Sequence, residues 1–346
     1  MASAYEHTRE EFAALLTDEP RYRVDQIWRG LWVENQEIDA ITTIPKTLRA
    51  RLGEQFTTGL EVANDVQSDH GSTRKWVFRL HDGSTIETVL MSYEDRVTVC
   101  VSSQAGCAMG CTFCATGQVG FTRHLSTGEV LEQVMFAARA AAPRRLSNVV
   151  FMGMSEPLAN YNVTVNAVRR LHEYRGLSVR HLTVSTVGVA PAIERLAREG
   201  IPLTLAVSLH AANDETRNEL VPLNRRYPLA RLREACEFWM ATTSRRLSFE
   251  WALIDGVNDT DQAMDELARF AGALRAHVNL IPLNPTPGFL VKGSTSERVR
   301  QFRDGLAAQG INATVRNTRG RSIDAACGQL ANVTNAKRRS IPVRSS

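Results

Sequence analysis

Three cysteines lie close together in the sequence and form its most distinctive chemical motif. They are Cys107, Cys111 and Cys114, with the spacing CxxxCxxC, and the small residues Ala108 and Gly110 between them let the backbone wrap closely. Such a loop aims three thiolates at one place, where they can hold three irons of a [4Fe–4S] cluster. The fourth iron then stays open to a substrate or cofactor. A cluster with three protein ligands therefore indicates a catalytic role, whereas four protein ligands indicate a structural or electron-transfer role.

A structural zinc ion is the alternative interpretation of this motif, with His124 or a distant cysteine as the fourth ligand. Zinc sites usually show paired CxxC knuckles, whereas this chain has a single CxxC, and the pattern therefore favours iron and sulfur. Of the remaining cysteines, Cys236 sits within a helical apolar pattern that is typical of a buried, inert thiol.

The elements that position these residues alternate between short apolar runs and longer helical patterns. The runs are 97–101, 148–152, 181–185, 203–209, 247–254, 278–283 and 313–316. Capping boxes at Ser126–Glu129 and Ser294–Glu297 predict the starts of two of the helices. The alternation predicts parallel strands in an α/β fold. Periodicity alone leaves open whether the sheet is doubly wound or forms a closed or partial barrel.

Residues that could bind a ligand or take part in a reaction follow almost every one of these runs, at the carboxyl end of the predicted strand. Beyond the cysteine cluster they are Ser155, Glu156, Ser185, Ser208, Leu209, His210, Asn284 and Cys327. In (β/α) barrels the active site is built on that rim, whereas an open sheet concentrates its site at one switch point. The distribution therefore favours a barrel-like ring.

The first part of the chain has a different organisation. Residues 1–58 show helical patterns, including a capping box at Thr8–Glu11. Residues 59–91 indicate β structure, with runs at 76–80 and 85–91 around the turn residues Asp82-Gly83. This pattern predicts a hairpin.

Composition limits the class of protein. The chain has 346 residues, 43% of them apolar and 23% charged, which is typical of a globular protein and argues against disorder. No apolar run approaches the ~18 residues of a membrane span. The first twenty residues lack the basic and then apolar pattern of a signal peptide, so we expect no membrane association and a cytoplasmic location.

Positive charge gathers at the C-terminal end. Lys337, Arg338, Arg339 and Arg344 are accompanied by no acidic residue after Asn335, and these four equal the whole formal excess of +4. A basic tail on a nearly neutral body suits a polyanion such as RNA. A solvated tail without a partner explains the charge equally well.

The cysteine motif, with the aromatic Phe113 before its last cysteine, resembles that of the radical S-adenosylmethionine superfamily. The blocks 100–107 and 323–330 are more specific, and they resemble the RlmN/Cfr family of RNA methyltransferases. The similarity extends from 22–28 to Leu330, nearly the whole chain.

This resemblance implies a fold and a set of domains. We expect an α/β protein, a partial (β/α) barrel of the radical S-adenosylmethionine type with a small helical N-terminal domain and a β-hairpin extension. The expected parts are an RNA-docking domain at 1–58, the hairpin at 59–92, the barrel at 93–322, and a C-terminal loop and basic tail at 323–346.

The resemblance also implies roles for particular residues. Cys107, Cys111 and Cys114 would hold the [4Fe–4S] cluster. The S-adenosylmethionine contacts would come from Ser155, Glu156, Ser185, Ser208, Leu209, His210 and Asn284. Cys327 would carry a methyl group, Cys100 would release the product by forming a disulfide with Cys327, and Glu87 would accept a proton.

One departure from the family concerns Ser155, because the family usually has Gly-Glu-Pro where this chain has Ser155-Glu156-Pro157. A glycine that uses a positive φ would make serine costly at this position. A β-region backbone would accept serine, whose hydroxyl then adds a hydrogen bond. The sequence leaves both possibilities open.

The expected activity is methylation of carbon 2 of an adenosine in 23S rRNA and in tRNA, with two S-adenosylmethionine molecules per turnover. We expect a monomer that receives electrons from a donor such as flavodoxin or ferredoxin. Three alternatives remain: methylation of carbon 8, as in the Cfr branch; a different radical enzyme, which would not need Cys327; and a non-catalytic RNA-binding protein with zinc.

Overall fold

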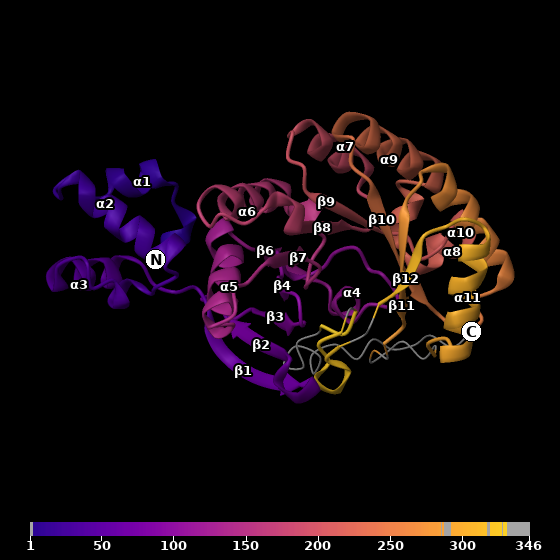
Figure 1. Ribbon diagram of the computed structural model, residues 1–346, viewed down its shortest axis with the longest axis horizontal. Coiled ribbons are helices and arrows are strands. Elements are labelled where there is room, and N and C mark those ends of the chain that lie inside the picture. Colours follow the sequence, from indigo (N-terminus) through magenta and orange to yellow (C-terminus); the bar gives the residue numbers. More distant parts are fainter. Residues whose placement is uncertain (1–2, 285, 287–291, 317–318, 327, 331–346) are drawn as a thin grey trace.

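The computed structural model describes residues 3–284, 286, 292–316, 319–326 and 328–330. Its central feature is one curved sheet with the strand order β1-β2-β3-β4-β7-β8-β9-β10-β11-β12 (Figure 1). The strands from β4 onward pair in parallel, and β1 to β4 pair antiparallel. Since β4 and β12 are not paired with each other, the barrel is partial, and the α/β prediction is confirmed.

The parallel strands coincide closely with the predicted apolar runs. They are β4 (Val97–Cys100), β7 (Asn148–Phe151), β8 (Leu182–Thr186), β9 (Thr204–Ser208), β10 (Leu247–Leu253), β11 (His277–Pro282) and β12 (Ala313–Val315). A small separate ribbon pairs β5 (Gln104–Gly106) with β6 (Phe121–His124). Parallel strands need crossover connections, which the helices provide.

Helices cover the outer side of the curved sheet (Figure 1). They include α5 (Thr127–Ala140), α6 (Tyr161–Glu173), α7 (Ala190–Arg198), α9 (Leu229–Thr243), α10 (Asp261–Ala273) and α11 (Ser296–Ala308), with the shorter α4 (Ala115–Val119) and α8 (Asp214–Leu220) in the connections. Ser126 caps α5 through the predicted box with Glu129. The predicted box at Ser294 is wrong: Thr295 caps α11, and the Ser294 hydroxyl donates to Asp259 instead.

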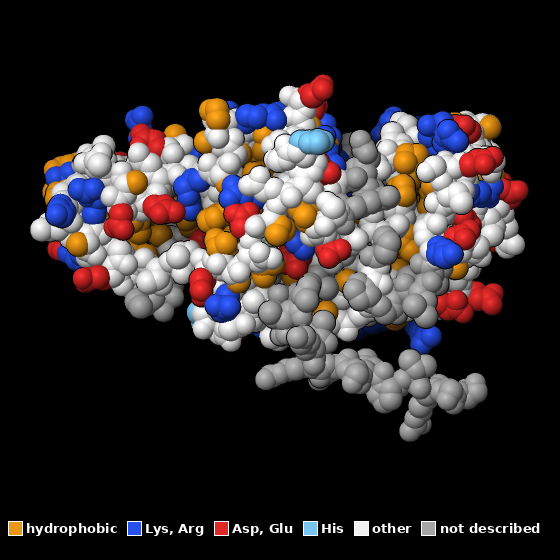
Figure 2. Space-filling view, turned by 90° about the horizontal axis from the view of Figure 1, so that it is seen from below, with side chains coloured by type: hydrophobic (Ala, Val, Ile, Leu, Met, Phe, Trp, Pro, Cys, Tyr) orange, Lys and Arg blue, Asp and Glu red, His pale blue; other side chains and the backbone are white. Residues whose placement is uncertain are grey.

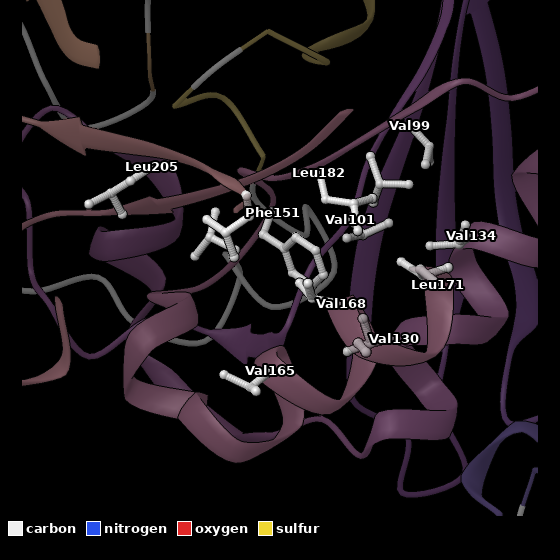
Figure 3. Close-up of a cluster of buried hydrophobic side chains, with 14 of the residues drawn as sticks. Val99, Val101, Val130, Val134, Phe151, Val165, Val168, Leu171, Leu182 and Leu205 are labelled. Atoms are coloured by element: carbon white, nitrogen blue, oxygen red, sulfur yellow. The ribbon is translucent and has the colours of Figure 1, made fainter. Parts of the chain in front are cut away.

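The core lies between the sheet and these helices. Figure 3 shows Val130 and Val134 of α5 and Val165, Val168 and Leu171 of α6 facing apolar side chains of the strands. Phe151 and Leu182 belong to the same cluster, and both are fully buried. Burial of each such side chain stabilises the fold by about 1.5–3 kcal/mol. Because the outer face of the sheet is covered by helices, the inner face is the one that can carry an active site.

The predicted hairpin is confirmed and is part of a larger structure. Strands β2 (Thr73–Arg79) and β3 (Thr85–Ser92) pair around the turn at Asp82-Gly83, and β1 (Glu61–Ser68) adds a third strand. Because β3 also pairs with β4, these strands continue the sheet of the barrel. Trp76 and Phe78 pack edge-on against Phe136 of α5. The opposite face of the hairpin is therefore turned toward the interior of the barrel.

The N-terminal helices form a compact unit against α5 and α6. They are α1 (Arg9–Ala14), α2 (Arg21–Trp28) and α3 (Lys46–Gln55), with the predicted capping box at Thr8. Trp28 packs edge-on against Tyr174 after α6, with ring centroids 4.9 Å apart. The amide of Gly128 donates to the carboxylate of Glu6 at 2.6 Å, which fixes the unit at the start of α5.

The surface carries both signs of charge. On the face shown in Figure 2, Lys and Arg side chains of the described residues are interspersed with Asp and Glu side chains. The predicted basic tail from Asn335 lies outside the described residues. In the part of the chain that the structure describes, no helix combines the length and the apolar character that a membrane crossing requires.

The segment after β12 lies across the gap between the two edges of the sheet. Its start is bonded to β11, where the Arg316 amide donates to the Leu280 carbonyl at 2.8 Å. A few residues later the Arg319 guanidinium donates to the carbonyl of Ser92 at 2.8 Å, at the end of β3. The Gly320 amide donates to Asp69, between β1 and β2, at 2.9 Å. The described C-terminal residues therefore connect the two ends of the open barrel.

Candidate active site

The three clustered cysteines lie in a tight loop between β5 and α4. Gly110 has φ +66°, the left-handed conformation that glycine adopts without strain, in agreement with the predicted close wrapping. Gly106 has φ +81°, and a Cβ there would lie 1.9 Å from the Gly120 carbonyl. The Cys107 amide donates to that same carbonyl at 2.9 Å, so the loop is closed at its base.

The thiols suit a metal cluster in their chemistry. Burial raises the pKa of the Cys107 thiol to about 12 and raises the pKa of Cys111 well above its ordinary value, with mutual repulsion among the thiolates adding to the effect. Buried thiols of this kind become thiolates when a metal displaces their protons.

The zinc alternative gains no support from the geometry. Among the described residues, no three His, Cys, Asp or Glu side chains are placed to share one metal ion. His124, the candidate fourth ligand, is exposed and has its Nδ1 3.1 Å from the side-chain nitrogen of Gln104. In a cluster each thiolate binds a separate iron, so convergence on a single ion is not required.

A cavity opens beside the cysteine loop, inside the barrel. Of the predicted site residues, its lining includes Cys111, Cys114, Ser155, Glu156, Ser185, Ser208, His210 and Asn284. These residues come from the carboxyl ends of different strands, which is where (β/α) barrels place their active sites.

Ser155 and Glu156 follow β7 and have different environments. Ser155 lines the cavity, and its buried hydroxyl has no hydrogen-bond partner among the described residues. Both oxygens of Glu156 accept backbone amides, from Leu158 at 3.0 Å and from Val187 at 2.8 Å. Burial raises the pKa of Glu156 to about 7, against the effect of these hydrogen bonds.

The backbone conformation of Ser155 shows whether serine is costly where the family usually has glycine. Ser155 is not among the residues with positive φ. A glycine is therefore not required at this position for conformational reasons. The neighbouring Gly153 is the constrained residue, because a Cβ there would lie 2.6 Å from the Val101 carbonyl.

The ends of β8 and β9 supply the opposite wall. The hydroxyls of Ser185 and Ser208 lie 3.4 Å apart. The His210 ring accepts the Ala252 amide at Nδ1, at 3.0 Å, so its proton is on Nε2. Burial, with the nearby charge of Arg217, lowers the pKa of His210 to about 3, which keeps the ring neutral.

Leu209 differs from its neighbours in the predicted site. Its side chain is fully buried in the main core and is absent from the cavity lining. Its backbone amide donates to the Glu250 carbonyl at 3.0 Å.

A second cavity adjoins the first and shares Met152, Ile281, Asn284 and Arg316 with it. Cys100, at the end of β4, lines this second cavity. Cys327 lies outside the described residues, but both of its neighbours are described. Ala326 lines the cavity of Cys100, and Gly328 lines the cavity of the clustered cysteines.

Glu87 lies on β3, on the inward face of the hairpin, and lines neither cavity. It is 1% exposed and forms an ion pair with Lys75, at 3.4 Å between Nζ and Oε2. The next residue on the same face, Val89, clusters with Cys100 and Leu330. Glu87 is thus close to the C-terminal segment.

Sequence reasoning missed Arg217 of α8, which is 1% exposed. Its guanidinium donates to the carbonyls of Leu209 at 3.0 Å and Val187 at 2.7 Å, and so joins the loops after β8 and β9. It also donates to the side chain of Asn224 at 2.7 Å. No local pattern marks this arginine, because two of these partners are backbone carbonyls of loops that follow other elements.

Two other missed residues are polar residues within apolar patterns. Gln133 lies on the buried side of α5, accepts the Ser102 amide at 2.9 Å and donates to the Ser102 carbonyl at 2.9 Å. Glu250 lies on β10 and faces Arg316, at 3.4 Å. A charged residue inside a strand run and an amide inside an apolar helix are signals that could have found them.

Known proteins resemble this chain over nearly its whole length. Residues 101–271 match the family model of the radical SAM superfamily. A probable dual-specificity RNA methyltransferase RlmN from Frankia alni is 52% identical, over 92% of this chain and 80% of that protein. A protein of the same description from Chloroflexus aurantiacus is 48% identical, over 94% of this chain and 92% of its own length.

A solved structure has the same fold. The crystal structure of a radical SAM methyltransferase from Sphaerobacter thermophilus superposes with a TM-score of 0.92 and is 51% identical in sequence. The match covers 95% of this chain and 99% of that chain. Together with the cysteine loop and its cavity, these matches show that the chain belongs to the RlmN family of radical S-adenosylmethionine RNA methyltransferases, enzymes that use a [4Fe–4S] cluster and S-adenosylmethionine.

Proposed function

We propose that this enzyme methylates carbon 2 of an adenosine in 23S rRNA and in tRNA, through a methyl group carried on Cys327. Relatives that share about half of its sequence are described as dual-specificity RNA methyltransferases RlmN. The observation that carries the proposal is the position of the neighbours of Cys327. Gly328 lines the cofactor cavity and Ala326 lines the cavity of Cys100, so the described residues on either side of Cys327 contact both cavities.

The chemistry requires such an arrangement. A carbon of the adenine ring is not nucleophilic, so it does not attack the methyl group of a sulfonium directly. When bound, the cluster and S-adenosylmethionine supply a radical that can remove a hydrogen atom from a methyl group. The protein contributes position and shielding: Cys107, Cys111 and Cys114 would hold the cluster, and Ser155, Glu156, Ser185, Ser208, His210, Asn284 and the backbone of Leu209 would surround the S-adenosylmethionine.

Two further residues would release the product. Glu87 accepts the proton from carbon 2 of the radical adduct between Cys327 and the RNA. The one unpaired electron of the adduct would return to the iron–sulfur cluster that supplied it, which restores the aromatic ring. The Cys100 thiolate then attacks the sulfur of Cys327, and a disulfide forms. As the bond between sulfur and the methylene carbon breaks, its electron pair goes to that carbon, which gains a proton and becomes the methyl group.

The RNA would contact parts of the chain outside the barrel. We assign this contact to the helical domain 1–58 and the basic tail, which hold the folded RNA while the target base is unstacked into the barrel. The other proposed parts of the chain are the hairpin 59–92, the barrel 93–322, and the C-terminal loop and basic tail 323–346. We propose a monomer in the cytoplasm that is reduced by flavodoxin or ferredoxin.

Mass spectrometry tests the proposal at both ends of the methyl transfer. The protein is expressed with iron and kept without oxygen, and the mass of the Cys327 peptide is measured. RNA from a reaction with 23S rRNA and tRNA is digested, and the methylated adenosines are separated. We expect one added methyl on Cys327 and 2-methyladenosine in both RNAs.

Cysteine variants provide the control. Cys327→Ala abolishes both products, whereas Cys236→Ala, which removes a fully buried thiol of α9, retains them. A product of 8-methyladenosine alone would refute the proposed position. Full turnover by Cys327→Ala would refute the role of the methyl-carrying cysteine and favour a different radical enzyme.

A further inference from the structure

Lys75 is a buried lysine that the proposed chemistry does not yet use. It lies on β2, and its side chain is 9% exposed. Lys75 pairs with Val89 across the antiparallel strands, which places it diagonal to Glu87 on the same face of the hairpin. Burying a lysine away from water is costly unless its charge is compensated, so its partners are informative.

The Lys75 ammonium has two partners from distant parts of the chain. Its Nζ lies 3.4 Å from a carboxylate oxygen of Glu87. It also donates to the backbone carbonyl of Asp324, at 3.2 Å, three residues before Cys327. A single cation thus touches both the proposed proton acceptor and the segment that leads to the proposed methyl carrier.

Glu87 has a strongly desolvated carboxylate. Burial raises the pKa of Glu87, the positive charge of Lys75 opposes that effect, and the negative charge of Asp324 adds to it. Lys75 from β2 and Asp324 from the C-terminal segment are the charged groups of the described residues that act on it. Strand β4, which pairs with β3, contributes Cys100 to the same face as Glu87. The Ser102 hydroxyl donates to the backbone carbonyl of Glu87 at 2.7 Å.

We propose that Lys75 is a positioning residue of the reaction, which keeps the Glu87 carboxylate ionised and beside the segment that carries Cys327. The proposal rests on the roles proposed above for Glu87 and Cys327. In the step concerned, the bond between carbon 2 and its hydrogen breaks, its electron pair stays in the purine ring, and the proton binds to a Glu87 oxygen. The unpaired electron of the radical adduct would return to the iron–sulfur cluster. A protonated Glu87 cannot take part.

The segment around Cys327 has enough other anchors to stay docked without Lys75. Before Cys327, the Gly320 amide donates to Asp69 at 2.9 Å and Arg319 donates to Ser92. After it, the Gly328 carbonyl accepts the amide of Ala115 at 2.8 Å. Removing the Lys75 charge should therefore affect the ionisation of Glu87 more than the transfer of a methyl group to Cys327.

The test compares Lys75→Met with Lys75→Arg and wild type in a single turnover. Enzyme already methylated on Cys327 is mixed with an RNA fragment, S-adenosylmethionine and reductant at several pH values. The covalent adduct between protein and RNA, and the free methylated RNA, are quantified separately. Arg79→Met is the matched control, because Arg79 is an exposed cation on the same strand that pairs with exposed Glu61.

We expect Lys75→Met to carry methyl on Cys327 at the wild-type level but to release product at least about tenfold more slowly near pH 7, with the adduct accumulating. Loss of an opposite charge at this distance raises a carboxyl pKa by about 1–3 pH units. Product release should therefore recover at a correspondingly higher pH. Lys75→Arg restores the wild-type pH profile, and Arg79→Met leaves it unchanged.

The remaining outcomes overturn either the inference or its basis. A wild-type pH profile in Lys75→Met overturns the inference, and so does loss of iron and of Cys327 methylation in that variant, because the role would then be structural. Glu87→Gln distinguishes failure of the Lys75 inference from failure of the proposed role of Glu87. If Glu87→Gln blocks release while Lys75→Met does not, only the inference fails; if Glu87→Gln releases product normally, the proposed role of Glu87 fails.

Lys75→Met combined with Glu87→Gln completes the cycle. A residue that acts only through Glu87 adds no further loss once Glu87 is replaced. An additive loss in the double variant would contradict the inference.

Discussion

Glu132 of α5 is a buried carboxyl whose ionisation should control the stability of the protein. It is 7% exposed and lies where the chain passes from the N-terminal helices to β1. Its carboxylate accepts the Gly59 amide at 2.8 Å. Burial raises the pKa of Glu132 to about 7, from an ordinary value of 4.5, although this hydrogen bond lowers it. Glu132→Gln replaces it with a neutral side chain of the same shape.

The sign and size of the effect follow from this difference in pKa. Between pH 4.5 and 7 the native protein holds a proton on Glu132 that the unfolded chain releases. The stabilisation is therefore complete below pH 4.5 and is lost as the pH rises through 7. At about 1.4 kcal/mol for each pH unit, the difference between 4.5 and 7 corresponds to about 3 kcal/mol.

Urea unfolding of both proteins between pH 4.5 and 8 measures this effect. The free energy of unfolding of wild type minus that of Glu132→Gln should decrease by about 3 kcal/mol over this range. Glu173→Gln, which changes an exposed residue of α6, serves as the control and should show no such trend. A difference between wild type and Glu132→Gln that stays constant with pH would refute the reasoning.

Three further predictions concern the cofactor site. Arg217→Leu leaves several buried carbonyls without their donor and should lower the free energy of unfolding by about 3–5 kcal/mol, as measured by urea unfolding. Gly106→Ala places a Cβ 1.9 Å from the Gly120 carbonyl, so we expect iron content, measured after anaerobic reconstitution, to fall severalfold. Ser155→Ala removes a hydroxyl that has no partner among the described residues and should weaken S-adenosylmethionine binding about 3- to 10-fold, by calorimetry with the cluster in place. Retained affinity in Ser155→Ala would show that this hydroxyl does not contact the cofactor.

Much of the barrel was predictable from the sequence because its strands are buried on the side that faces the helices. The run 148–152 became β7 and the run 203–209 became β9, each with bounds within two residues. The continuation of β1 to β3 into the barrel was not predicted, since strand pairing between distant segments leaves no local pattern. The cap of α11 was placed one residue early, because Ser294 and Thr295 are equally suitable caps and only the tertiary contact of Ser294 with Asp259 distinguishes them.

The site residues that could be predicted are those that directly follow strands. His210 and Ser155 line the cavity because the carboxyl ends of parallel strands meet at one rim. Arg217 and Lys75 were not found, because each acts through backbone carbonyls or charges that are distant in the sequence. Their signal is burial of a cation, which a sequence pattern does not reveal.

The contacts of the C-terminal segment determine the order in which the protein can be completed during synthesis. The strands of the barrel are added one after another along the chain, and each pairs with a strand made earlier, from β7 to β12. The bonds from Arg319 to Ser92 and from Gly320 to Asp69 join residues 227 and 251 positions apart. They form only after every strand has been made. Until the segment after β12 has been synthesised, the two ends of the sheet therefore lack the hydrogen bonds that connect them.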